Sequence, residues 1–192
     1  MNALAEPQVH LWTRREYYRM AEMGLFRDKH VELVEGQVIE MSPMGSLHAT
    51  AVALTARALE KAFSQGYFVR WQMPLDAEEI SEPEPDVAVI AGDVRDYREA
   101  HPTTAVLIVE VADTSLTYDR TEKASLYAKT GILVYWILNL IDRRIEVRRN
   151  PGPDATQPFG FGYADVKSVS STDSLAPLAV PQAVIAVADL LP

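Results

Sequence analysis

Two acidic residues each adjoin a short apolar run in this chain of 192 residues. Asp86 directly precedes residues 87–90, and Glu110 directly follows residues 106–109. Apolar runs of this length indicate buried strands, and an ionised carboxylate beside a sheet core is costly unless it is paired or binds a metal. Lys123 follows Glu110 closely in the sequence. One Asp and one Glu from neighbouring strands, with an ammonium group nearby, predict a site for a hard cation.

The segment around Glu110 must position this site. After strand 106–109, Asp119 and Glu122 have the spacing of a capping box, which predicts a helix that opens at Asp119. The helix should end before Gly131, and residues 133–138 should form a second buried strand. Strand, helix and strand of these lengths predict a crossover unit. Ligands of such units bind at the carboxyl ends of the strands, where Glu110 is expected.

The remaining segments predict one mixed α/β domain over residues 1–192, with a central mixed sheet flanked by helices. Helices are expected from the capping box Thr13–Glu16 to about residue 23, and from residue 47 to residue 63 with Ser46 as the cap. Further expectations are a hairpin over 31–41, strands over 67–75 and 144–149, a turn at 150–154, a loop over 168–174, and a short strand and turn in the tail.

The order of these motifs resembles that of the Uma-two-like restriction endonucleases, a branch of the PD-(D/E)XK nuclease superfamily. Each motif alone is weakly specific, but their order along most of the chain is fairly specific. The resemblance rests on residues 32–43 with His48, on Pro85-Asp86, on Val109-Glu110-Val111, and on Thr114, Ser115, Asp119, Lys123, Tyr127, Gly131, Tyr135 and Trp136.

The resemblance implies a restriction-endonuclease-like fold and hydrolysis of DNA phosphodiester bonds with Mg²⁺, which Mn²⁺ could replace. In the superfamily pattern a lysine lies two residues after the acid, but this chain has Ala112 there. The resemblance therefore implies that Lys123, on the following helix, takes over the role of that lysine. A second departure is Asp113-Thr114-Ser115, where family members often have Ser-Pro-Ser.

Phosphodiester hydrolysis needs a nucleophilic water and a cation that absorbs charge on the phosphate. Because Mg²⁺ prefers oxygen ligands and keeps several waters, the Asp86 and Glu110 carboxylates and the Val111 carbonyl would suffice as protein ligands. Lys123 would then orient or deprotonate the attacking water and hold the phosphate. The competing interpretations are acids solvated at strand ends and a lysine solvated on its helix.

Three more residues are candidates for this site. The resemblance implies that Glu32 joins the acidic cluster, although strand alternation could equally turn it to solvent. His48 falls in the first turn of a helix, where backbone amides favour an anion, so it could contact phosphate or lie on the surface. Tyr127 shares a helix face with Lys123, and it could bind substrate or belong to the core.

The charge balance opposes a nuclease, because the formal net charge of −9 disfavours nonspecific binding of a polyanion. The alternative is therefore a catalytically silent module of the same fold that binds DNA or a protein. We also expect a homodimer, since nucleases that cut both strands commonly pair two sites. The chain has no cysteine, so thiolate ligands are excluded. The sequence shows no signal peptide or membrane span, and a cytoplasmic protein is expected.

Overall fold

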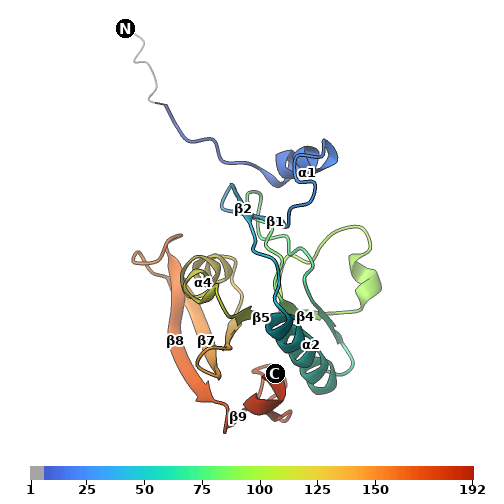
Figure 1. Ribbon diagram of the computed structural model, residues 1–192, viewed down its shortest axis with the longest axis vertical. Helices are drawn as coiled ribbons and strands as arrows, with labels where there is room; N and C mark the ends of the chain where they lie inside the picture. The colour runs from blue at the N-terminus through green and yellow to red at the C-terminus, as the bar shows by residue number, and fades with distance from the viewer. Residues whose placement is uncertain (1–6) are drawn as a thin grey trace.

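A computed structural model describes residues 7–192 and contains a central six-stranded sheet with the order β3-β4-β5-β6-β7-β8 (Figure 1). All neighbouring strands are antiparallel except β5 and β6, which are parallel. The mixed α/β class predicted from the sequence is thereby confirmed, whereas the division into one domain stays a prediction. The strands are β3 (Tyr67–Arg70), β4 (Val87–Ala91), β5 (Leu107–Ala112), β6 (Val134–Asn139), β7 (Arg144–Pro153) and β8 (Phe161–Ser170).

The crossover from β5 to β6 is helical, as predicted, but its helix begins earlier than expected. It consists of α3 (Leu116–Tyr118), a π-helical segment (Asp119–Lys123) and α4 (Ala124–Lys129). The prediction of an N-cap at Asp119 is wrong, because Asp119 lies inside the helical segment and is buried. The Ser115 hydroxyl donates to its carboxylate over 2.6 Å. Gly131 follows the helix with a φ of 77°, as the predicted stop requires.

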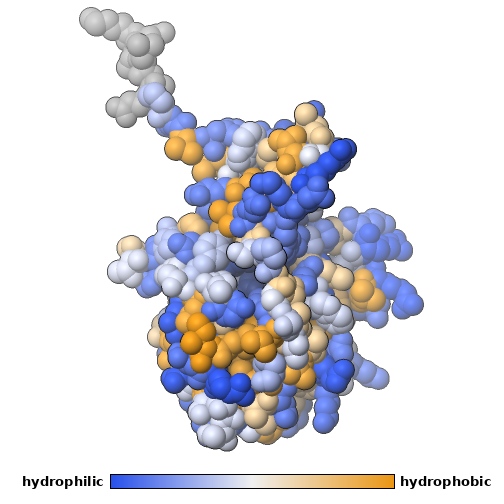
Figure 2. Space-filling model, in the orientation of Figure 1, coloured by the Kyte–Doolittle hydropathy of each residue, from blue (hydrophilic) through white to orange (hydrophobic). Residues whose placement is uncertain are grey.

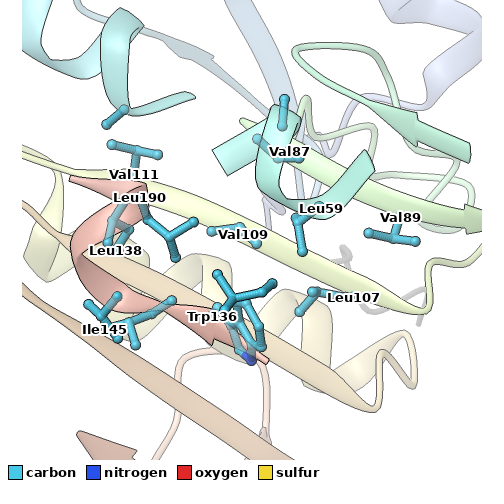
Figure 3. Packing of buried hydrophobic residues seen from close by; sticks show 14 of the residues in the cluster. Leu59, Val87, Val89, Leu107, Val109, Val111, Trp136, Leu138, Ile145 and Leu190 are labelled. Atoms are coloured by element: carbon cyan, nitrogen blue, oxygen red, sulfur yellow. The ribbon is translucent and has the colours of Figure 1, made fainter. Parts of the chain in front are cut away.

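Each face of the central sheet packs against a separate apolar core. Odd-numbered residues of β4 and β5 face the helix α2 (Ser46–Ala62) and the C-terminal 3-10 helix (Val187–Leu190). Figure 3 shows Leu59 beside Val87 and Val109, and Leu190 beside Val111 and Leu138. Even-numbered residues such as Ile108 and Ala112 face α4 on the other side. Because strand side chains alternate, Asp86 and Glu110 share the parity of this second face.

The N-terminal part of the chain forms its own small unit above the sheet (Figure 1). The helix α1 (Arg14–Glu22) begins with the predicted Thr13–Glu16 capping box. The strands β1 (Val31–Val34) and β2 (Gln37–Glu40) form a two-stranded hairpin outside the central sheet. Its turn needs Gly36, whose φ is 74° and where a Cβ would lie 2.5 Å from the Cβ of Leu11. The predicted hairpin over 31–41 is confirmed.

Several predicted boundaries in the rest of the chain are wrong. The strand β3 ends at Arg70. The strand β7 continues through residues 150–153, which were predicted as part of a turn over 150–154, because Pro151–Pro153 pair with Tyr163–Phe161 of β8. Residues 168–170, predicted as loop, end β8. Helix α2 starts at Ser46, and its N-cap Gly45 makes no side-chain cap bond. The tail forms the predicted short strand, since β9 (Ser174–Leu175) pairs with β10 (Ile185–Ala186).

None of the helices within residues 7–192 has the length and apolar character that a bilayer crossing needs.

Candidate active site

The structure brings Asp86 and Glu110 together through hydrogen bonds with the backbone. The backbone N–H of Asp86 donates to Glu110 Oε2 over 3.0 Å, and the N–H of Val111 donates to Asp86 Oδ2 over 2.8 Å. Asp86 directly precedes β4, and Glu110 lies within β5, so the antiparallel pairing of these strands fixes both carboxylates. They therefore converge on one face at one end of the β4–β5 pair.

Lys123 extends from the π-helical segment into the same cluster. Its Nζ lies 2.5 Å from Glu32 Oε2 and 3.3 Å from Glu110 Oε1. The three side chains are almost completely buried, with exposed fractions of 2% for Lys123, 2% for Glu32 and 5% for Glu110. The inward alternative for Glu32 is the one observed, because the hairpin β1–β2 directs this carboxylate at the ammonium rather than at solvent.

Tyr127 completes the inner part of the cluster. It lies one helical turn after Lys123, and its hydroxyl donates to Glu110 Oε1 over 2.6 Å. Its ring is fully buried and meets that of Tyr135 edge to face at 5.1 Å. Tyr127 is thus a core residue whose hydroxyl orients Glu110, and a direct contact with substrate would need rearrangement of this packing.

Burial and the neighbouring charges together raise the pKa values of both Glu110 and Lys123. Burial raises the pKa of Glu110 to about 8, and the nearby Asp86, Asp119 and Glu32 carboxylates add to this shift, while Lys123 opposes it. Burial alone would lower the pKa of Lys123, but Glu110 and Glu32 outweigh burial and raise it. The ammonium is therefore charged at neutral pH, with Glu32 as its nearest partner. Together with burial, the repulsion among the carboxylates appears as the raised pKa of Glu110.

His48 closes the more open side of the site. It projects from the first turn of α2, and its Nε2 lies 3.0 Å from Asp86 Oδ1. The hydrogen bond with Asp86 raises the pKa of His48, although burial opposes the shift. The exposed fractions of the His48 and Asp86 side chains, 16% and 15%, exceed those of Glu110 and Lys123. Solvent therefore reaches the cluster from the His48 side, and Figure 2 shows a hollow between the regions of α2 and α4.

Asp119 is a buried acid near this cluster that the sequence analysis did not assign to the site. Burial raises its pKa to about 6, and the charges of Asp86 and Glu32 contribute to the shift. The hydroxyl of Tyr135 donates to the Asp119 carbonyl oxygen over 3.0 Å, which ties the π-helical segment to β6. Its position four residues before Lys123 was a usable signal, because residues with this spacing share a helix face.

The oxygen atoms around Asp86 and Glu110 suit a hard cation. A carboxylate has about four acceptor positions, and the hydrogen bonds described above leave some of them free on both groups. In an extended strand the N–H and C=O of one residue point to the same side, so the Val111 carbonyl is directed to the side of Asp86. Within residues 7–192 no group of three or more His, Asp or Glu residues is placed to hold a metal. A cation here would therefore depend on two carboxylates, a carbonyl and water.

A mixed sheet with an acidic cluster where β4 and β5 meet defines a restriction-endonuclease-like protein. The model of the Uma2 family, described as "Putative restriction endonuclease", matches residues 14–188. This chain therefore belongs to the Uma2 family, as the order of its motifs indicated.

A solved structure gives the same fold. The crystal structure of "a putative nuclease belonging to DUF820 from Anabaena variabilis ATCC 29413" superimposes with a TM-score of 0.68 and 13% sequence identity. The superposition covers 93% of this chain and 96% of that chain. At this identity the likeness concerns the fold. No curated protein matches the sequence of this chain.

Proposed function

We propose that this protein is a Mg²⁺-dependent endonuclease that hydrolyses DNA phosphodiester bonds. The observation that carries the proposal is the convergence of Asp86 and Glu110, each held by a backbone N–H, with the Lys123 ammonium 3.3 Å from Glu110. Membership of the Uma2 family supports the nuclease class.

Asp86, Glu110 and the Val111 carbonyl would hold the cation, with Mg²⁺ as the expected ion and Mn²⁺ as a substitute. When bound, such an ion supplies Lewis-acid stabilisation of the negative charge that develops on the phosphate. The raised pKa of Glu110 supports a cationic ligand, because a carboxyl group with this environment gains a full negative charge most readily beside added positive charge.

Lys123 would hold the attacking water and the phosphate, taking the place of the lysine that is absent at Ala112. Its pKa is raised, so it serves as a charged donor rather than as a base until a rearrangement separates it from Glu32. Glu32 fixes the ammonium, and Tyr127 fixes Glu110. His48, hydrogen-bonded to Asp86 at the open side, is placed to contact a phosphate that approaches Asp86.

Cleavage assays on supercoiled, linear duplex and single-stranded DNA test this proposal, each with Mg²⁺, Mn²⁺, Ca²⁺ or EDTA. We expect Mg²⁺-dependent products from the parent protein and none from Asp86→Asn. The control is Asp93→Asn, because Asp93 is 63% exposed and an asparagine there preserves its helix-capping role. Equal cleavage by Asp86→Asn and the parent would refute the proposed site.

The alternative is a binding module on the same fold that does not turn over substrate. Two observations favour it. The net charge is −9, and the Lys123 side chain is only 2% exposed and already forms an ion pair with the Glu32 carboxylate. Saturable DNA binding with no cleavage under any of the metal conditions would favour this alternative. A homodimer is compatible with either function.

A further inference from the structure

A second concave site adjoins the proposed active site. It is an open groove of about 330 Å³ between α2 and the segment that follows β3. Its walls include Met44, Val52, Ala56, Arg57, Trp71 and Gln72. Trp71 and Met44 are 47% and 45% exposed, so both offer apolar surface to the groove.

Two elements connect the walls of the groove to residues of the acidic cluster. The backbone N–H of Gln72 donates to the carbonyl of Pro85 over 2.9 Å, and Pro85 is the residue before Asp86. On the other wall, His48 contacts Asp86 and immediately precedes Ala49, which lines the groove. On both walls, a residue of the groove is thus one residue or one hydrogen bond away from a neighbour of Asp86.

The lining suits a flat aromatic ring with polar edges. An indole face and a thioether offer polarizable contacts to such a ring, and the alanines of α2 leave room beside them. The Arg57 guanidinium, the Gln72 amide and the Glu60 carboxylate supply donors and acceptors at the rim. These are the groups that pair with the edges of nucleobases.

The net charge of the protein also limits which ligand the groove can bind. A protein with a net charge of −9 gains little from general attraction to phosphates. Stacking of a base on an aromatic side chain is worth about 1–3 kcal/mol and does not depend on net charge. A base inside a regular duplex cannot reach such a groove, because its faces are covered by its neighbours.

We propose that this groove binds an unpaired nucleobase, stacked on Trp71, of a DNA strand whose phosphate lies at Asp86. The substrate is then single-stranded DNA, or duplex DNA with a displaced or mismatched base, rather than regular duplex. This inference rests on the proposed function for the placement of the phosphate.

Tryptophan fluorescence tests the groove without any need for cleavage. The chain has three tryptophans; Trp136 is fully buried, so a Trp12→Phe background leaves Trp71 as the exposed reporter. The titration uses a short single-stranded oligonucleotide in EDTA, the same length of abasic strand, and the matching duplex. We expect the base-containing strand to quench Trp71, and the abasic strand and the duplex to quench it far less.

Variants locate the effect at Trp71. Trp71→Ala should weaken binding of the single strand roughly 5- to 150-fold, measured by anisotropy of a labelled oligonucleotide. Trp71→Phe should retain most of the affinity, and Trp12→Ala, which alters an exposed tryptophan outside the groove, should match the parent. Circular dichroism of each variant verifies folding.

The outcomes separate this inference from the proposed function. Equal binding of the abasic strand, or of the duplex, or an unchanged affinity of Trp71→Ala, would overturn the groove assignment. If cleavage proceeds and does not depend on Trp71, the nuclease stands and the groove assignment falls. If the base-containing strand stacks on Trp71 and no condition gives cleavage, the groove stands and the protein is a binding module.

Discussion

The ammonium of Lys123 and the carboxylate of Glu32, 91 residues apart in the sequence, form an ion pair from which water is nearly excluded. Their side chains come from the π-helical segment and from the separate hairpin, so the pair connects the N-terminal unit to the sheet that carries Glu110. Removing one member of a buried pair leaves an uncompensated charge. Removal of either member alone should therefore destabilise the fold, apart from its effect on the proposed chemistry.

Lys123→Met should lower the free energy of unfolding by about 3–5 kcal/mol, because Glu32 would remain buried without its partner. Urea unfolding followed by circular dichroism measures the change. The matched control is Lys61→Met on the exposed side of α2, where a change of about 0.5 kcal/mol or less is expected. Adding Glu32→Gln to Lys123→Met should restore part of the loss. Equal stability of the Lys123 and Lys61 variants would show that the ion pair is not enclosed as described.

In EDTA, the stability of the protein should decrease as the pH rises from about 5 to about 8. Burial raises the pKa of Glu110 from 4.5 to about 8 and that of Asp119 from 3.8 to about 6. In this range the folded protein binds more protons than the unfolded chain, so raising the pH favours unfolding. Thermal unfolding at several pH values measures the effect. Glu110→Gln should make the dependence shallower, and a steep dependence that survives in this variant would contradict the assignment.

Neutralising either proposed metal ligand should weaken divalent binding without unfolding the protein. Asp86→Asn and Glu110→Gln each remove an anionic oxygen ligand, and the loss of like-charge repulsion should leave the metal-free protein at least as stable as the parent. Calorimetric titration with Mn²⁺ measures the affinity. Because Glu110 has a raised pKa, binding by the parent near pH 7 should release protons, seen as a dependence on buffer ionisation enthalpy. An affinity unchanged in both variants would place the cation elsewhere.

Moving the lysine back to position 112 tests whether Lys123 replaces it. Lys123→Ala should abolish cleavage while metal binding stays nearly intact, because the lysine is not a ligand. Ala112 lies two residues after Glu110 on the same face of β5 and is fully buried. Ala112→Lys alone should destabilise the fold, because it adds a second buried amine beside Lys123. Combined with Lys123→Ala it should recover part of the activity. Full activity of Lys123→Ala would end the displaced-lysine mechanism.

Self-association is expected through the late strands or the tail. The strand β8 forms one edge of the central sheet, and it exposes Val166 at 55%, while Val184 in the tail is 72% exposed. A strand at the sheet edge and exposed apolar side chains favour a two-fold contact. Sedimentation should show a dimer at micromolar concentration, and Val166→Lys or Val184→Lys should shift it to monomer. A parent protein that remains monomeric at high micromolar concentration would contradict this prediction.

The sequence was sufficient for those parts of the fold that depend on short-range patterns. The Thr13–Glu16 capping box, the Gly36 turn and the strands around Asp86 and Glu110 follow from local residue types. The length of β7 did not, because Asn150-Pro151-Gly152 has turn chemistry and becomes strand only by pairing with β8. Tertiary pairing here outweighs local preference.

In the candidate site, too, features set by local patterns were predicted and features set by tertiary contacts were not. The motif order named Asp86, Glu110, Lys123 and Glu32, and the structure places these residues in one cluster. The burial of Asp119 and the partnership of His48 with Asp86 were missed, because both depend on contacts between distant segments. The spacing of Asp119 and Lys123 indicated a shared helix face, but the capping-box spacing with Glu122 favoured an N-cap instead.

The hairpin that supplies Glu32 lies outside the central sheet and reaches the cluster only through long-range contacts. During synthesis, the chain up to β5 contains Glu32, Asp86 and Glu110 but lacks the helical segment that carries Lys123, whose ammonium pairs with Glu32 and Glu110. Contacts between residues this far apart in sequence form slowly, because long loops must close first. The four charged groups of the cluster therefore come together only after the crossover to β6 is made, so an incomplete or partly folded chain lacks the assembled candidate site.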